Sequence, residues 1–116
     1  MDVIRKVAQN QQLKDLLASG KVYREQPFML NVKAKEVIAN CNLDDDVVLQ
    51  GIVDVVIIKE ETAIVLDYKY TKHPEYIKQN YGSQLNSYAM AVERICKVTS
   101  VEKYVMSIAN NQLIKL

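Results

Sequence analysis

The stretch VVLQGIVDVVIIKEETAIVLDYKY (residues 47–70) decides the fold of this chain. It contains two segments rich in Val and Ile, residues 47–58 and 63–70, separated by four polar residues. This pattern is typical of two β-strands joined by a short turn. Both faces of each predicted strand are apolar, which indicates that the hairpin lies inside a sheet covered on both sides.

The predicted hairpin sets two carboxylates opposite each other. If the turn is symmetric and two or four residues long, Ile58 pairs with Ala63 and Asp54 pairs with Asp67. Lys69 then shares a face with Asp67, because side chains alternate along a strand. Paired residues have Cβ atoms only ~5 Å apart, where like charges destabilise the sheet. A divalent cation is the natural group to compensate them.

A second interpretation of these three residues is a plain ion pair between Asp67 and Lys69, with Asp54 pointing to solvent. A buried, unpaired carboxylate costs several kcal/mol, which makes an isolated Asp54 in so apolar a strand unfavourable. Spacing alone leaves both interpretations open.

The rest of the chain predicts helices and strands around the hairpin. We expect a helix over residues 3–18, weakened by polar residues 9–12 and stopped by Gly20. A strand over residues 21–32 follows, in which Pro27 favours an edge position or a bulge. Residues 40–46 are turn-like.

Downstream of the hairpin we expect a short helix over residues 75–81, an interruption at Gly82 and a longer helix capped by Ser83. The core stripe of this longer helix consists of Leu85, Tyr88, Ala89, Val92 and Ile95. Strands over residues 101–109 and 113–116 complete the pattern. The order predicts one domain over residues 1–116, with an α/β or α+β fold and a central mixed sheet flanked by helices.

The overall composition is that of an ordinary globular domain. Of the 116 residues, 49% are hydrophobic and 25% are charged, which argues against disorder. The net charge of +1 provides no global attraction for nucleic acid, so such binding requires a local basic patch. The best candidate is Lys69, Lys72, His73 and Lys78, for which a solvated turn that happens to be basic is the other interpretation. The sequence has no signal peptide and no apolar run of membrane-spanning length, so we expect a soluble, cytoplasmic protein without membrane contact.

Oxygen ligands of the kind supplied by Asp54 and Asp67 suit Mg²⁺, with Mn²⁺ as a substitute. The main-chain carbonyl of Tyr68 would add a third oxygen. Hydrolysis of a phosphodiester needs such a cation and a group that orients the attacking water. Lys69 would lie beside the metal and either position this water or stabilise developing charge.

Further residues are candidates for supporting roles. Gln84 and Tyr88 lie four apart on one helix face, where Gln84 would hydrogen-bond the substrate backbone or a metal-bound water and Tyr88 would pack beneath it with its hydroxyl at the site. Periodicity alone favours Tyr88 as a core residue and Gln84 as an exposed one. Glu25 reaches the site only if its strand neighbours Asp54. Lys72 and His73 follow the second hairpin strand, and His73 is expected at the surface.

The combination of Gly51-Ile-Val-Asp54, Asp67-Tyr-Lys69 and Gln84-x-x-x-Tyr88 resembles the signature of the RecB-like nucleases of the PD-(D/E)XK, restriction-endonuclease-like superfamily. Beyond these motifs, Val22-Tyr-Arg-Glu25-x-Pro27-Phe28 and the helix from Gln84 to Glu93 are similar to the C-terminal nuclease domain of AddA (RexA) helicase–nuclease subunits. The resemblance covers nearly the whole chain.

The resemblance implies that Asp54 and Asp67 bind Mg²⁺, that Lys69 is the catalytic lysine and that Gln84 and Tyr88 support the site. It also implies DNA as substrate, a role in processing double-strand ends, and a second subunit of the AddB (RexB) type. An upstream helix whose histidine completes the metal shell in this family is not in the sequence, so we expect a C-terminal fragment. The alternatives are a catalytically incomplete nuclease fold that binds DNA or docks a partner, and a purely structural domain.

Overall fold

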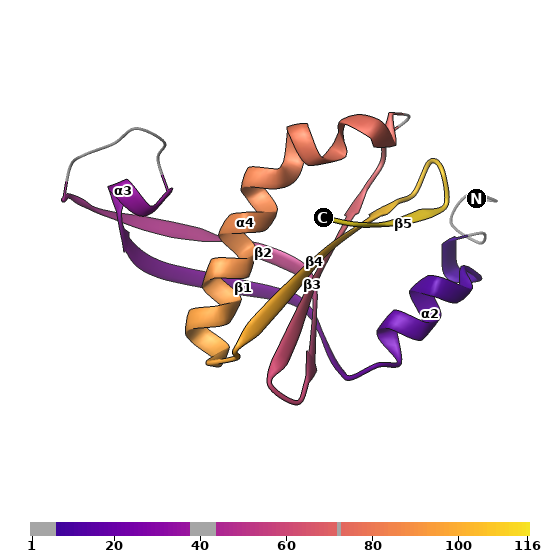
Figure 1. Cartoon of the computed structure of the whole chain (residues 1–116), viewed down its shortest axis with the longest axis horizontal. Helices are drawn as coiled ribbons and strands as arrows, with labels where there is room; N and C mark the ends of the chain where they lie inside the picture. Colours follow the sequence, from indigo (N-terminus) through magenta and orange to yellow (C-terminus); the bar gives the residue numbers. More distant parts are fainter. Residues whose placement is uncertain (1–6, 38–43, 72) are drawn as a thin grey trace.

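A computed structural model describes residues 7–37, 44–71 and 73–116 of the chain. Its centre is a five-stranded sheet in the spatial order β1-β2-β3-β4-β5 (Figure 1). The strands are β1 (Lys21–Lys33), β2 (Asp46–Lys59), β3 (Thr62–Lys69), β4 (Ser100–Ser107) and β5 (Gln112–Lys115). Strands β3 and β4 pair in parallel and all other neighbours are antiparallel. The prediction of a mixed sheet flanked by helices is confirmed.

The β2–β3 hairpin has the predicted register. Ile58 pairs with Ala63 and Lys59 with Thr62, so the turn consists of Glu60 and Glu61 alone. Glu60 adopts a left-handed conformation with φ 55°, which a tight hairpin turn requires. The ladder ends at Val55 and Leu66, one pair before the two aspartates.

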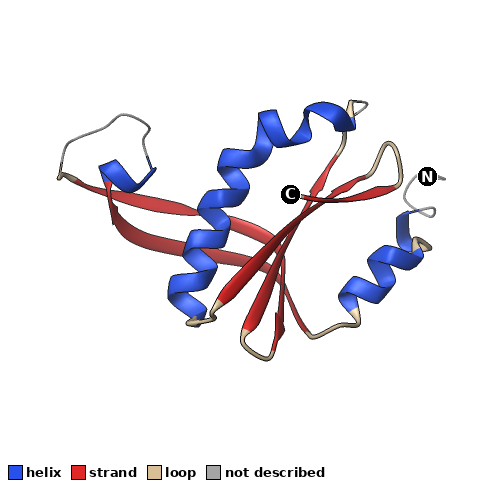
Figure 2. Ribbon diagram, viewed as in Figure 1, coloured by secondary structure: helices blue, strands red, loops and turns tan. Residues whose placement is uncertain are grey.

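Strand β1 lies at an edge of the sheet, as the proline in it predicted. Beyond the point where β2 leaves β3, residues 26–33 of β1 and 46–53 of β2 pair only with each other. They form a two-stranded ribbon that projects from the sheet (Figure 2). The short helix α3 (Ala34–Val37), which the sequence did not predict, follows β1 at the tip of this ribbon.

Helix α4 (Ile77–Cys96) links β3 to its parallel neighbour β4 and is preceded by the 3₁₀ turn η1 (Pro74–Tyr76). The predicted interruption at Gly82 and cap at Ser83 are wrong, because the helix is continuous through both. A helical glycine costs about 1 kcal/mol. Ile77 and Leu85, on either side of it, are fully buried, and each contributes about 1.5–3 kcal/mol. In the predicted core stripe, Ile95 is instead 52% exposed.

Helix α2 (Gln11–Leu17) packs on the other side of the sheet. The predicted N-terminal helix is broken at Asn10, where the weak polar stretch falls, and residues 3–6 lie outside the described part. The Asn10 side chain caps α2 by accepting a hydrogen bond from the Leu13 N–H at 3.0 Å. Gly20 does not stop the helix, which ends at Leu17. Its role is close packing, since a Cβ there would lie 2.4 Å from the Ile58 carbonyl oxygen.

The sheet is covered on both faces, as the two-sided apolar pattern predicted. On the α4 face, Val56 and Val65 pack with Leu85 and Val92 of the helix. On the α2 face, Ile57 and Leu66 pack with Leu13. Among the described residues, no helix has both the length and the apolar content needed to cross a membrane.

The two glycines Gly20 and Gly82 should respond in opposite ways to the same substitution. Gly20→Ala should lower the free energy of unfolding by about 1–3 kcal/mol, because the new methyl group meets the backbone of β2. Gly82→Ala should raise it by about 1 kcal/mol, because nothing lies within 4 Å of the new methyl group. Urea denaturation of both variants measures these changes, and a stable Gly20→Ala protein would contradict the packing described here.

Candidate active site

Strands β2 and β3 separate at the two aspartates, and a side chain takes the place of the missing ladder bond. Oδ2 of Asp54 accepts a hydrogen bond from the Tyr68 N–H at 2.9 Å. The ladder itself ended one pair earlier, at Val55 and Leu66. The Asp54 carboxylate is therefore held in the gap between the strands, beside Asp67.

Asp67 is the buried member of the pair, with only 3% of its surface exposed. Its Oδ2 has no hydrogen-bond partner within the described part of the chain. Nζ of Lys69 lies 3.0 Å from that oxygen. This distance makes an ion pair, although the contact does not meet the geometry of a hydrogen bond to that oxygen. One oxygen of a buried carboxylate is thus left without a directed donor.

Burial, together with the neighbouring Asp54 carboxylate, raises the pKa of Asp67 to about 6, and the Lys69 ammonium opposes this rise only in part. The cause is physical: two carboxylates in contact, one of them desolvated, disfavour full ionisation. A pair of this kind gains from any cation that enters the gap. The donor set fits a hard divalent ion such as Mg²⁺.

The main-chain carbonyl of Tyr68 faces the same gap. Successive residues of a strand direct their N–H and C=O groups to alternate edges, and both groups of one residue point to the same edge. The carbonyl of Lys69 accepts a hydrogen bond from the Ile108 N–H on the β4 side, and the Tyr68 N–H points to Asp54 on the β2 side. The Tyr68 carbonyl therefore points toward β2 as well, where a third oxygen was predicted.

Helix α4 presents two tyrosines and one glutamine to the site: Tyr81, Tyr88 and Gln84. Nζ of Lys69 lies 4.6 Å from the centre of the Tyr81 ring, a cation–π contact. Nε2 of Gln84 donates to the Tyr88 hydroxyl at 2.9 Å. Tyr81 was missed in the sequence, although its spacing of three and seven residues from Gln84 and Tyr88 puts all three on one helix face.

The environment of Tyr88 keeps its hydroxyl protonated. Burial raises its pKa, and the Asp67 carboxylate nearby adds to the effect. Because the oxygen already accepts from Gln84, the O–H proton remains available for donation. The Tyr88 ring contacts the Phe28 ring edge-on with centroids 5.6 Å apart. Both rings close over Gly51, where a Cβ would come within 3.3 Å of each, so the glycine of the first motif makes room for them.

The remaining candidates differ in position. Glu25 lies on β1 opposite Asp54, as was required for it to reach the site, and lines a surface hollow with Arg24, Asp54 and Tyr68. His73 lies at the surface, 3.3 Å from Glu75. Lys72 falls outside the described residues. Within the described ranges, no group of three or more His, Cys, Asp or Glu residues is placed to hold a metal.

The stability of the metal-free protein should depend on the charge of Asp67. Its folded pKa lies above the ordinary 3.8, so the folded state binds this proton more tightly between about pH 4 and 6, and stability falls as pH rises through that window. In EDTA, Asp67→Asn should therefore stabilise the protein at pH 8 by up to about 3 kcal/mol relative to its effect at pH 4.

The control for this substitution is Asp46→Asn, which removes an exposed carboxylate paired with Lys33. Its effect on the melting temperature should not grow between pH 4 and pH 8 in the same way. An Asp67→Asn effect equal at both pH values would mean that Asp67 is already ionised at low pH and is not desolvated as described.

Comparison with known proteins agrees with the motifs. A family model described as the PD-(D/E)XK nuclease superfamily matches residues 3–111. The chain is 35% identical over 111 residues to an ATP-dependent helicase/nuclease subunit of Ligilactobacillus salivarius, a match that covers 92% of the chain and 8% of that protein.

Two further relatives carry the same name. The protein from Clostridium botulinum (strain 657) is 32% identical over 109 residues, which cover 89% of the chain and 8% of the relative. The protein from Ruminiclostridium cellulolyticum is 28% identical over 111 residues, with 89% and 9% covered. The chain thus spans less than a tenth of the length of these relatives. The resemblance seen in the sequence is confirmed, and the chain belongs to the PD-(D/E)XK nuclease superfamily.

Proposed function

We propose that this chain is a metal-dependent DNA nuclease domain that hydrolyses phosphodiester bonds with Mg²⁺, for which Mn²⁺ can substitute. The observation that carries the proposal is the buried Asp67 oxygen without a hydrogen-bond donor, in contact with a second carboxylate and an ammonium. A structural ion pair would need only one of the two aspartates. The second carboxylate raises the energy of the pair unless a cation joins it.

The residues that would hold the cation are Asp54, Asp67 and the carbonyl of Tyr68. When bound, Mg²⁺ would neutralise phosphate charge and lower the pKa of water. The hydrogen bond from the Tyr68 N–H fixes Asp54 Oδ2 and leaves its other oxygen for a ligand. The contact between Asp67 and Lys69 keeps the ammonium at the edge of the gap.

Lys69 and the α4 residues would act on the substrate. Hydrolysis forms one phosphorus–oxygen bond from water and breaks the bond to the leaving oxygen, which takes up a proton. The Lys69 ammonium, steadied by Tyr81 at 4.6 Å, stabilises the negative charge that develops at phosphorus. Gln84 and Tyr88 position the DNA strand or the attacking water from the α4 side of the site. Tyr88 does so by donating a hydrogen bond from the hydroxyl proton that it retains.

The names of the relatives suggest the wider setting. Each is named as an ATP-dependent helicase/nuclease subunit. We infer that this domain acts as an exonuclease within a longer chain of that type, during processing of DNA double-strand ends for recombinational repair in the cytoplasm. A second helicase–nuclease subunit would then be its protein partner.

The hydrolytic role is tested by cleavage of linear single- and double-stranded DNA in Mg²⁺ and in Mn²⁺. Lys69→Ala should lower the rate by about 100-fold or more, because it removes a charge aimed at the transition state. The matched control is Lys115→Ala, since Lys115 also pairs with a carboxylate at 3.0 Å and lies over a tyrosine ring, but on β5. Equal cleavage by wild type and Lys69→Ala contradicts the proposal. DNA binding without cleavage by the wild type would indicate a binding module instead.

Metal binding is tested separately by thermal unfolding. Mg²⁺ or Mn²⁺ at about 100 times its dissociation constant should stabilise the wild type by about 2.7 kcal/mol, a rise of several degrees in melting temperature. Asp54→Asn and Asp67→Asn should remove this rise, whereas Asp46→Asn should keep it. No rise in the wild type, together with a stabilised Asp54→Asn protein, would show that the carboxylate pair is not a metal site.

A further inference from the structure

The pairing of β1 with β2 is interrupted at one position, opposite Asp54. Arg24 pairs with Val55 and Gln26 pairs with Val53, so neither strand gains or loses a residue between these pairs. The pair between them, Glu25 with Asp54, is absent from the ladder. A bulge would shift the register, and this interruption does not.

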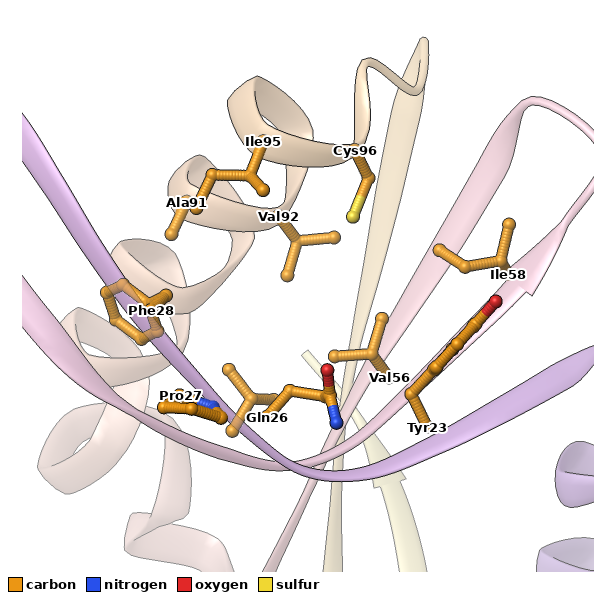
Figure 3. A pocket seen from close by; sticks show the side chains of 11 residues that line it. Tyr23, Gln26, Pro27, Phe28, Val56, Ile58, Ala91, Val92, Ile95 and Cys96 are labelled. Carbon is orange, nitrogen blue, oxygen red and sulfur yellow. The ribbon is translucent and has the colours of Figure 1, made fainter.

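On both strands, the alternation of side chains between the two faces of the sheet is reversed at this pair. Tyr23 and Phe28, five residues apart, line the same pocket below α4 (Figure 3), while Val22, next to Tyr23, packs on the α2 face. On β2, Val53 and Val56, three residues apart, pack in the same cluster on the α4 face. In a regular strand, residues an odd number apart lie on opposite faces. The alternation is therefore reversed between Tyr23 and Phe28 on one strand and between Val53 and Val56 on the other.

Asp54 lies at the reversal, and this explains the direction of its side chain. Side chains of a regular strand stand perpendicular to the sheet. The Asp54 carboxylate instead reaches sideways to the Tyr68 N–H of β3. The side chain of a residue at which this alternation is reversed can lie in the plane of the sheet. For Asp54, that direction leads into the gap between β2 and β3.

Glu25 has the backbone conformation that produces such a reversal. Its φ is 50°, in the left-handed region that non-glycine residues rarely adopt. Three other described non-glycine residues have positive φ: Glu60, Lys97 and Asn111. Each of those lies in a turn or at a helix end, where this conformation is common, whereas Glu25 lies inside a strand. Conformations of this kind inside regular structure cluster at functional sites.

We propose that the left-handed backbone of Glu25 positions the active site: it reverses the β1–β2 pair so that Asp54 leaves the ladder and places its carboxylate in the gap beside Asp67. Glu25 is thus a positioning residue that acts through Asp54, and the backbone rather than the exposed carboxylate carries the effect. The consequence for metal binding rests on the proposed function, whereas the consequence for the Asp54–Tyr68 hydrogen bond does not.

The test compares substitutions that accept or resist a left-handed backbone. Glu25→Gly accepts it, Glu25→Gln has the same backbone preference as glutamate, and Glu25→Val, being β-branched, resists it. Glu25→Thr, which is also β-branched, takes its place if Glu25→Val does not fold. The control is Glu60→Val, which places the same change at the other left-handed glutamate, in the hairpin turn.

The first readout is hydrogen exchange of the Tyr68 amide by NMR, in EDTA. Glu25→Val should speed exchange of this amide about tenfold relative to core amides such as Ile57, and Glu25→Thr should do the same. Glu25→Gly, Glu25→Gln and Glu60→Val should leave it within about threefold of wild type. Unchanged Tyr68 exchange in both disfavoured variants overturns the proposal, whether or not the chain binds metal.

The second readout is Mg²⁺ affinity from the shift in melting temperature. Glu25→Val should weaken binding about tenfold, with Glu25→Gly and Glu25→Gln near wild type. If Glu25→Gln and Glu25→Gly instead lose as much affinity as Glu25→Val while Tyr68 exchange is unchanged, the carboxylate is the functional group and the backbone proposal is wrong. Absence of Mg²⁺ binding in the wild type would contradict the proposed function alone, since Tyr68 exchange still decides the role of Glu25.

Discussion

The hydrogen bond from the Tyr68 N–H to the Asp54 carboxylate, at the point where β2 and β3 separate, is the contact on which the site depends. It replaces a ladder bond between two main chains with a bond to a side chain, and the sheet can open there without leaving a buried donor unpaired. The opening leaves room for Asp67 beside Asp54, and the alternation of strand β3 directs the Tyr68 carbonyl toward the same gap. This contact and the strand geometry together account for the position of three oxygen-bearing groups.

This arrangement is unfavourable for folding, and the surrounding core compensates for it. A buried carboxylate next to another costs several kcal/mol. The residues before it on β3, Val65 and Leu66, are fully buried, one against each face of the sheet, and each contributes about 1.5–3 kcal/mol. The hairpin that carries the site is thus held by helices α2 and α4 together. The buried Asp67 carboxylate lowers the stability of the fold locally, as is common where a protein trades stability for activity.

Much of the fold and part of the site follow from local patterns in the sequence. The Val- and Ile-rich segments predicted the hairpin, its register and the adjacency of Asp54, Asp67 and Lys69, because strand alternation needs no long-range information. The ladder's end at Val55 was not predictable, since we propose that it depends on the left-handed φ of Glu25 on another strand. Gly20 and Gly82 were misread for a related reason. Whether a glycine ends a helix, continues one or allows close packing depends on what surrounds it in the folded chain. The spacing of Tyr81 from Gln84 and Tyr88 could have placed it on the same face of α4. Its contact with Lys69 could not be predicted, because it depends on how the helix packs on β3.

The most direct test of the account is a crystal structure of the chain with Mn²⁺, with anomalous scattering used to locate the ion. We predict a Mn²⁺ peak in the gap between β2 and β3, within coordination distance of Asp54, Asp67 and the Tyr68 carbonyl, and no peak there for Asp67→Asn. An empty gap at millimolar Mn²⁺, or an ion bound only at surface carboxylates such as Asp44 and Asp46, would contradict the central claim that the paired aspartates form a metal site.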